Sequence, residues 1–292
     1  MASKSYLDNL NPTQRIVAGL LIVAVAALIA YLRVRSEKPA PPPSGPTLAN
    51  RNVRFGMPAP ANADPANADA YLIERPQYVL SYNDSKRSAN WVSWNLAGSD
   101  IGDTKRLLHF DPDPDLPSSF RKVRHEDYTG SGFDRGHLCP SKDRTDSADN
   151  NRATFYTTNI VPQSAACNRG GWERFESHCR DLTRDGSELY IACGPHGTGG
   201  TGEKGPRDAI GGATRINVPG AVWKVVLVVP DGRASPGPNS KMLAVWMPND
   251  RTVPEAWQPY RVPVATVEQR TGYKFFPLVP DEVASPLKNS GP

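Results

Sequence analysis

Two long apolar runs in the C-terminal half place the strongest constraint on the fold of this 292-residue chain. Val222 to Val229 (VWKVVLVV) and Lys241 to Met247 (KMLAVWM) are rich in β-branched and aromatic residues, which is typical of buried strands. The segment between them, Pro230 to Ser240, is rich in Pro and Gly and predicts a connecting loop. The two runs therefore predict two buried strands, and the sheet is expected to be substantial.

Shorter segments extend the expected sheet. Tyr78 to Tyr82 and Trp91 to Leu96 carry aromatic and β-branched residues on either side of the turn-rich segment Asn83 to Ala89, which is the pattern of a β-hairpin. Leu189 to Cys193 is a further apolar run of strand length.

Helical periodicity is clearest from Gly171 to Thr183, where four apolar side chains fall on one face. These side chains are Trp172, Phe175, Cys179 and Leu182. A second helix is predicted from Val264 to Thr271, ending at Gly272. Strands interleaved with few helices indicate the α+β class, with a central, mostly antiparallel sheet flanked by helices.

The N-terminal part contains a separate apolar segment. From Ile16 to Leu32 the chain has 17 residues without a charge, at the short end of the roughly 17 to 25 residues that span a bilayer as a helix. A cleaved signal peptide is the alternative, but no small-x-small cleavage site follows the apolar region. We therefore expect a retained transmembrane helix as the membrane anchor within residues 1–35.

The rest of the chain is expected to divide into three parts. Residues 36–70 are rich in Pro, Ala, Asn and Asp, which favours a semi-rigid linker over a packed core. Residues 71–280 are expected to form one domain, followed by a C-terminal tail of residues 281–292. The formal net charge of +4 is compatible with a polyanionic partner but equally ordinary for a soluble protein. Charge alone therefore selects no function.

One short segment concentrates reactive side chains, because Asp134, Arg135, Gly136 and His137 are consecutive. Alternate side chains of a strand share a face, so Arg135 and His137 are expected to address one phosphate group. Arg forms paired hydrogen bonds with phosphate oxygens, and His, with an unperturbed pKa of about 6.5, can take a proton from water. Gly136 is expected to permit close backbone approach or an unusual dihedral angle.

A second group of polar residues follows. Asn168 lies just before the predicted helix, where its amide oxygen could coordinate a hard cation that keeps its waters, as Mg²⁺ prefers. Glu176 would lie roughly 12 Å further along a regular helix, which favours an outer-shell role over direct binding. Taken alone, His137 would suit a structural histidine and Asn168 a helix N-cap. Their joint occurrence favours an active site.

These motifs, D-R-G-H followed by T-N-I-V-P-Q and N-R-G-x-W-x-x-x-E, closely resemble those of the DNA/RNA non-specific endonucleases, which include mitochondrial endonuclease G. The resemblance covers Asn90 to Pro277. It implies the ββα-metal nuclease fold, in which a strand carries the His and the start of a helix carries the metal ligand.

The resemblance also implies a role for each matching residue. His137 would be the general base, Asn168 the protein ligand of Mg²⁺ (or Mn²⁺), and Glu176 an outer-shell acceptor. Asn159, in T-N-I-V-P-Q, matches a supporting Asn of the site. The other matches are Asp134, Arg135 and Gly136, and Arg106 is the candidate for the family's upstream phosphate-contacting Arg.

The implied reaction is hydrolysis of phosphodiester bonds in double- and single-stranded DNA and RNA, with little sequence preference and with 5′-phosphate products. Two other classes of function stay open on sequence alone. One is a non-catalytic, membrane-tethered module that binds nucleic acid. The other is a phosphodiesterase that acts on small esters.

Location and partners depend on this interpretation. Basic residues on both sides of the apolar segment slightly favour a cytoplasmic domain. A non-specific nuclease facing the chromosome would be toxic, however, so we expect the domain to be extracytoplasmic, in the periplasm or on the outer surface. A homodimer and a protein inhibitor are further partners that the sequence leaves open.

The remaining cysteines and histidines have no comparable context. Cys139, Cys167, Cys179 and Cys193 could form disulfides in three pairings, and a bridge between Cys139 and Cys167 would join the two halves of the site. A zinc site is a weaker alternative because no C-x-x-C pair is present. The other four histidines are interpreted as structural or surface groups: His109, His125, His178 and His196.

Overall fold

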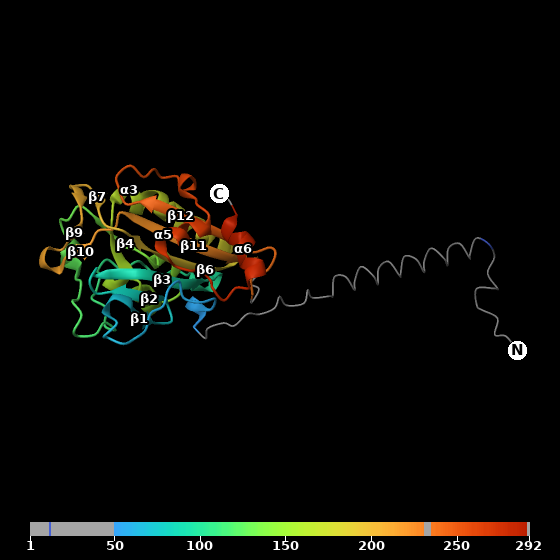
Figure 1. Cartoon of the computed structure of the whole chain (residues 1–292), viewed down its shortest axis with the longest axis horizontal. Helices are drawn as coiled ribbons and strands as arrows, with labels where there is room; N and C mark the ends of the chain where they lie inside the picture. Colours follow the sequence, from blue (N-terminus) through green and yellow to red (C-terminus); the bar gives the residue numbers. More distant parts are fainter. Residues whose placement is uncertain (1–11, 13–49, 231–234, 291–292) are drawn as a thin grey trace. The chain divides into compact units, whose positions relative to one another are not determined.

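A six-stranded antiparallel sheet forms the centre of the computed structural model (Figure 1). The strand order is β1-β2-β3-β6-β11-β12, and each neighbouring pair is antiparallel. The strands are β1 (Tyr71–Glu74), β2 (Val79–Asn83), β3 (Ser88–Leu96), β6 (Glu188–His196), β11 (Ala221–Val229) and β12 (Lys241–Pro248). The predicted central antiparallel sheet is confirmed.

The structure describes residue 12 and residues 50–230 and 235–290. The apolar segment 16–32, expected to be the membrane anchor, lies outside these residues, as does the first part of the expected linker, residues 36–49. Within the described residues, no helix is both long enough and apolar enough to cross a membrane.

The strand predictions agree with the sheet. β2 and β3 form the expected hairpin, and β11 and β12 pair along their length. β6 lies between the two hairpins and is longer than the apolar run that predicted it.

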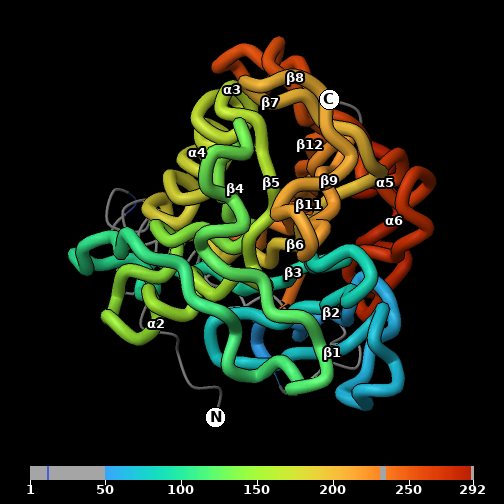
Figure 2. The backbone as a smooth tube through the Cα atoms, turned by 90° about the vertical axis from the view of Figure 1, so that its left-hand side faces the viewer, coloured from blue at the N-terminus to red at the C-terminus, as the bar shows by residue number. Residues whose placement is uncertain are grey.

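Alternation along β11 assigns the two faces of the sheet. Val222 and Val226 belong to one hydrophobic cluster, which also contains Phe175 of α4 (Glu173–Arg184). Trp223 and Val225 belong to a second cluster, which includes residues of α5 (Val264–Thr271) and α6 (Asp281–Asn289). Figure 2 shows α4 on one side of the sheet strands and α5 and α6 on the other. All nine residues of β11 are buried because both faces are covered.

The helix predicted from Gly171 begins two residues later. The chain first forms the short helix α3 (Ala165–Cys167) and a π-helical turn, η8 (Asn168–Trp172), before α4 starts at Glu173. Gly170 has non-helical angles (φ −101°, ψ −118°) and interrupts the helix there. The regular spacing that we assumed between Asn168 and Glu176 is therefore wrong, because a kink separates them.

The prediction for α5 is confirmed: the helix spans Val264–Thr271, and Gly272 ends it with φ +75°. In contrast, residues 281–289 are not a tail. They form α6, whose Ala284 is buried against α5 and the sheet.

Residues 51–70 also differ from the expected linker. Val53 and Phe55 are each 4% exposed and belong to the same cluster as α5 and α6. The Asn52 side chain donates to the backbone oxygens of Arg75 and Pro76. The linker prediction was therefore wrong for residues 51–70. It was based on the high content of Pro and Ala and did not take into account Val53 and Phe55, which pack in the core.

Three small two-stranded sheets lie outside the central sheet. They are β4 (Asp134–His137) with β5 (Ile160–Gln163), β7 (Gly200–Gly202) with β8 (Gly205–Arg207), and β9 (Ala209–Ile210) with β10 (Ile216–Asn217). A third hydrophobic cluster, which includes Phe110, Tyr128 and Phe155, packs beneath β4 and β5. The remaining helices are α2 (Ala148–Ala153), η2 (Arg51–Val53), η3 (Ala68–Ala70), η4 (Gly98–Asp100), η5 (His125–Tyr128), η6 (Ser141–Asp143), η7 (Thr157–Asn159), η9 (Gly212–Thr214) and η11 (Gln258–Tyr260).

Candidate active site

The D-R-G-H segment forms strand β4 and pairs with β5. Gly136 faces β5 so closely that a Cβ atom there would lie 2.2 Å from Oε1 of Gln163. A residue with a side chain could not occupy this position without moving β5. The expected close approach at Gly136 is therefore observed, and its φ angle is not positive.

A cleft of about 270 Å³ opens beside β4 and the start of the α3–α4 helix. Five of the seven residues predicted for the site line it: Arg106, Arg135, His137, Asn168 and Glu176. Arg135 and His137 share this cleft, as their alternation on a strand predicted. Asp134 and Asn159 do not line it: Asp134 contacts Asn168, and Asn159 contacts the chain just after His137.

His137 is buried, with 6% of its surface exposed, and its Nε2 atom has no hydrogen-bond partner among the residues that the structure describes. Its ring packs against Phe155 and Phe110, with ring centroids 4.9 Å and 5.4 Å away. Burial lowers the pKa of His137 to about 3, and the positive charge of Arg106 acts in the same direction. The imidazole is therefore neutral at pH 7 and has a nitrogen lone pair that can accept a proton.

Asp134 orients Asn168. The Nδ2 atom of Asn168 donates to Oδ2 of Asp134 at 2.9 Å. A carboxylate only accepts hydrogen bonds, so the amide nitrogen must face Asp134 and the amide oxygen is left for another partner. Asn168 is not an N-cap residue: it is the C-cap of α3, whose N-cap is Ser164, and the N-cap of η8 is Cys167. The N-cap interpretation is therefore wrong.

Asp134 has a second partner that the sequence did not indicate. Arg169 donates to both of its carboxylate oxygens, at 2.8 Å and 2.6 Å. Arg135 instead donates to the backbone oxygen of His125 (2.7 Å) and to Thr129 (3.0 Å). These two hydrogen bonds hold the Arg135 guanidinium beside the cleft.

The oxygens in the cleft suit one kind of cation. Among residues 50–230 and 235–290, no group of three or more His, Cys, Asp or Glu side chains is placed to hold a metal. The cleft offers the Asn168 amide oxygen and the Glu176 carboxylate, both hard ligands. Mg²⁺ keeps several waters and needs few protein ligands. The residues present therefore fit a hydrated divalent cation.

Glu176 is held from below by Lys224 of β11, whose Nζ lies 3.1 Å from Oε1 of Glu176. The Lys224 side chain is 1% exposed and lies over the rings of Trp172 and Trp94, at 4.3 Å and 5.3 Å. Burial raises the pKa of Glu176, while the Lys224 ammonium opposes this rise. Sequence reasoning missed Lys224, although a single cation inside the apolar run VWKVVLVV was a signal.

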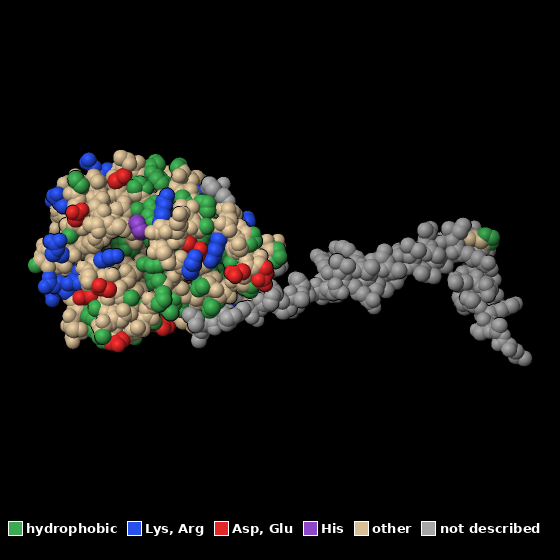
Figure 3. Space-filling model, viewed as in Figure 1, with side chains coloured by type: hydrophobic (Ala, Val, Ile, Leu, Met, Phe, Trp, Pro, Cys, Tyr) green, Lys and Arg blue, Asp and Glu red, His purple; other side chains and the backbone are tan. Residues whose placement is uncertain are grey.

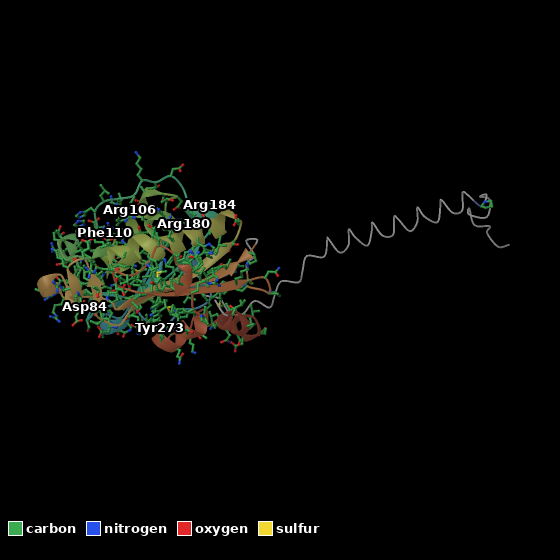
Figure 4. All side chains as sticks on the ribbon, turned by 90° about the horizontal axis from the view of Figure 1, so that it is seen from above. Asp84, Arg106, Phe110, Arg180, Arg184 and Tyr273 are labelled. Atoms are coloured by element: carbon green, nitrogen blue, oxygen red, sulfur yellow. The ribbon has the colours of Figure 1, made fainter. Side chains whose placement is uncertain are left out.

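Arg180 is a second buried cation that the sequence reasoning missed. It lies one turn after Glu176 on α4 and donates to Oδ1 of Asp143 at 3.0 Å. The spacing of four residues from Glu176 on one helix face was the available signal. Figure 4 shows Arg180 and Arg106 on the same side of the molecule, opposite Tyr273.

Arg106 comes from the segment between η4 and Phe110, far from β4 in sequence. Its guanidinium carbon lies 5.4 Å from the centroid of the Phe155 ring, against which His137 also packs. Burial lowers its pKa, whereas Glu176 raises it. The structure thus places the candidate arginine in the cleft.

Asn159 acts on the backbone next to His137. It is fully buried, and its side chain accepts from the Cys139 nitrogen and donates to the oxygens of Cys139 and Thr154, each at 2.9 Å. These bonds hold the chain immediately after β4. Asn159 is therefore in place to support the site without facing the cleft.

The four cysteines are buried and free, so the disulfides that the sequence allowed, including a bridge between Cys139 and Cys167, are not formed. All four belong to the hydrophobic cluster between the sheet and α4. They pack as small apolar residues.

Basic side chains extend beyond the cleft. A second hollow adjoins it and shares Arg135 and Arg169 with it, and Lys204 lines its far side. Figure 3 shows Lys and Arg side chains gathered at the end of the molecule that carries β9 and β10 in Figure 1. This distribution suits a substrate with several phosphates.

Comparisons with known proteins agree with the site. A family model described as DNA/RNA non-specific endonuclease matches residues 57–282. A nuclease of Nostoc sp. is 37% identical over 278 residues, covering 91% of this chain and 96% of that protein. The mitochondrial nuclease EXOG of Homo sapiens is 30% identical, covering 95% and 77%.

A solved structure shares the fold. The crystal structure of an EndoG/EndoGI complex matches with a TM-score of 0.66 at 24% identity, covering 80% of this chain and 93% of that one.

The fold and these matches define the class of protein: it is a nuclease, a hydrolase that acts on nucleic acids. More specifically, the chain belongs to the DNA/RNA non-specific endonuclease family.

Proposed function

We propose that this protein is a divalent-metal-dependent endonuclease that cleaves double- and single-stranded DNA and RNA with little sequence preference and leaves 5′-phosphates. The observation that carries the proposal is one cleft that joins the neutral imidazole of His137 to the free amide oxygen of Asn168. The β4–β5 pair followed by the α3–α4 helix supports the ββα-metal arrangement.

In this proposal, His137 takes a proton from the water that attacks phosphorus in line with the leaving 3′-oxygen. Arg135 and Arg106 place positive charge beside the phosphate. The phosphate anion of a bound substrate would raise the pKa of His137, which makes it a stronger base when substrate is present.

Asn168 would hold the cation directly, and Glu176 would hold it through hydrogen bonds in the outer shell. Mg²⁺ is the proposed ion, with Mn²⁺ as an alternative. When bound, the cation supplies positive charge that stabilises the charge developing on the phosphoryl group and the leaving oxygen. Little sequence preference follows because all these groups address phosphate and none reads a base edge.

The test is digestion of plasmid DNA and total RNA by the full chain in detergent, with Mg²⁺, with Mn²⁺ and with EDTA. His137→Ala is the test variant and His196→Ala, which lines a different hollow, is the matched control. Cleavage of both substrates that requires metal and His137 but not His196 is the expected result. Binding without cleavage under every metal would favour the non-catalytic module, and cleavage of nitrophenyl esters alone would favour the small-ester phosphodiesterase.

We also propose that residues 16–32 anchor the protein in a membrane with the nuclease domain on the extracytoplasmic side, in the periplasm or on the outer surface. Fractionation and protease accessibility in intact cells test this. Homodimerisation is tested by light scattering. The likeness to EndoG, whose structure was solved with EndoGI, supports a search for a protein inhibitor.

A further inference from the structure

Leu108 is the exposed large hydrophobic side chain of the described residues, at 87% exposure. A single exposed leucine is ordinary, but the neighbours of this one are tied to the active site. Arg106 lines the catalytic cleft, and Phe110 packs against His137. Figure 4 shows Arg106 and Phe110 close together on one side of the molecule. Leu107 packs against the cluster beneath β4 and β5, so the segment is anchored while Leu108 projects outward.

A flat aromatic surface lies next to Leu108. The rings of His109 and His125 are stacked, with centroids 4.8 Å apart and planes 8° from parallel. The His109 side chain is 65% exposed, and its Nε2 lies 3.5 Å from Oδ1 of Asp111. The Asp111 contact holds the edge of the ring, and the stacking orients its face. No sequence pattern distinguishes these two histidines from structural or surface groups.

The stacked histidine pair contacts Arg135 directly and His137 through Phe110. The backbone oxygen of His125 accepts a hydrogen bond from Arg135 at 2.7 Å, and Phe110 lies between the rings of His125 and His137, at 5.9 Å and 5.4 Å. Arg135 lines both the catalytic cleft and the adjoining hollow, and His125 lines the second. His125 therefore lies at the second hollow, and the stacked His109 ring with the neighbouring Leu108 lies beside it.

We propose that Leu108, His109 and His125 form a base platform: a subsite that holds the nucleobase next to the scissile phosphate by stacking and apolar contact. This inference rests on the proposed nuclease function. Stacking on an aromatic face is tolerant of sequence because every base has a π-face, so the platform adds affinity without adding base preference. In a duplex, stacking on the neighbouring base pairs covers the faces of each base, so the platform acts most strongly on unpaired substrate, whose bases unstack more easily.

The experiment uses the full chain and single-stranded oligonucleotides in which one phosphodiester linkage can be cleaved and the others are methylphosphonates. The base on the 5′ or the 3′ side of that linkage is replaced by an abasic residue. For the wild type, KM is expected to rise about five-fold or more when the base on the platform side is removed. With the intact oligonucleotide, Leu108→Ser and His109→Ala are expected to have a KM higher than that of the wild type by about the same factor. For these variants, replacing the base by an abasic residue should then change KM little.

Conservative variants separate stacking from other roles. Leu108→Met and His109→Phe keep apolar and stacking surface and are expected to retain the wild-type KM, while His196→Ala is the control histidine. The loss in Leu108→Ser should be smaller on duplex DNA than on single strands, with kcat largely unchanged.

The possible failures are distinguishable. If the wild type cleaves but Leu108→Ser and His109→Ala match it on both intact and abasic substrates, the platform is refuted and the nuclease function stands. If the variants lose kcat equally on every substrate, the residues act structurally and the platform is also refuted. If the wild type cleaves nothing, the proposed function itself fails.

Discussion

Acidification should destabilise the protein through His137. Its folded-state pKa of about 3 lies below the unfolded value of about 6.5, so the unfolded chain binds the additional proton as the pH falls. The stability linked to neutral His137 is therefore present above pH 6.5 and is lost as the pH falls toward 3. Between pH 7 and pH 5 the linkage relation gives a loss of about 2 kcal/mol from this one group.

The assay compares the wild type with His137→Leu, each as a fragment of residues 44–292 that lacks the apolar segment 16–32. Urea unfolding is measured at pH 7 and pH 5 in EDTA. His125, His178 and His196, whose pKa values are also lowered, mainly by burial, are present in both proteins. Their contribution cancels in the difference.

The free energy of unfolding of the wild type should fall about 2 kcal/mol more than that of the variant between the two pH values. Equal losses in the two proteins would mean that His137 titrates normally in the folded state. The argument that burial keeps the general base neutral would then be refuted.

Three further changes test other contacts of the site. Lys224→Met should lower the free energy of unfolding by about 3 to 5 kcal/mol, because it leaves the buried Glu176 carboxylate without its partner. The double variant Lys224→Met/Glu176→Gln should recover this stability in urea unfolding but should not recover activity. Asp134→Leu should weaken Mn²⁺ binding about ten-fold or more, measured by electron paramagnetic resonance, because the Asn168 amide loses the acceptor that orients it; unchanged affinity would contradict that role. Gly136→Ala should cost about 2 kcal/mol and lower activity, since the added methyl group overlaps β5; a variant with wild-type melting and activity would show that β5 moves easily.

Local patterns predicted several elements without any knowledge of packing. The hairpin of β2 and β3, the buried strands β11 and β12, and the end of α5 at Gly272 follow from apolar runs, turn residues and a helix-stopping glycine. The shared cleft of Arg135 and His137 follows from the two-residue repeat of a strand. These features depend on residues close together in the chain, so the sequence alone determined them.

Contacts between distant segments were decided only by the tertiary structure. Lys224 lies under Glu176 because β11 passes beneath α4, and the run of apolar residues around it suggested only a buried strand. Val53 and Phe55 join the core although their surroundings resemble a linker. Asp134 binds Arg169 and not its neighbour Arg135.

The physical reason is the same in each case. A periodic pattern reports which face of an element is apolar, whereas the partner of a charged or apolar side chain depends on which other element is packed against that face. That choice is made by the packing of the whole domain, and no short stretch of this sequence contains it.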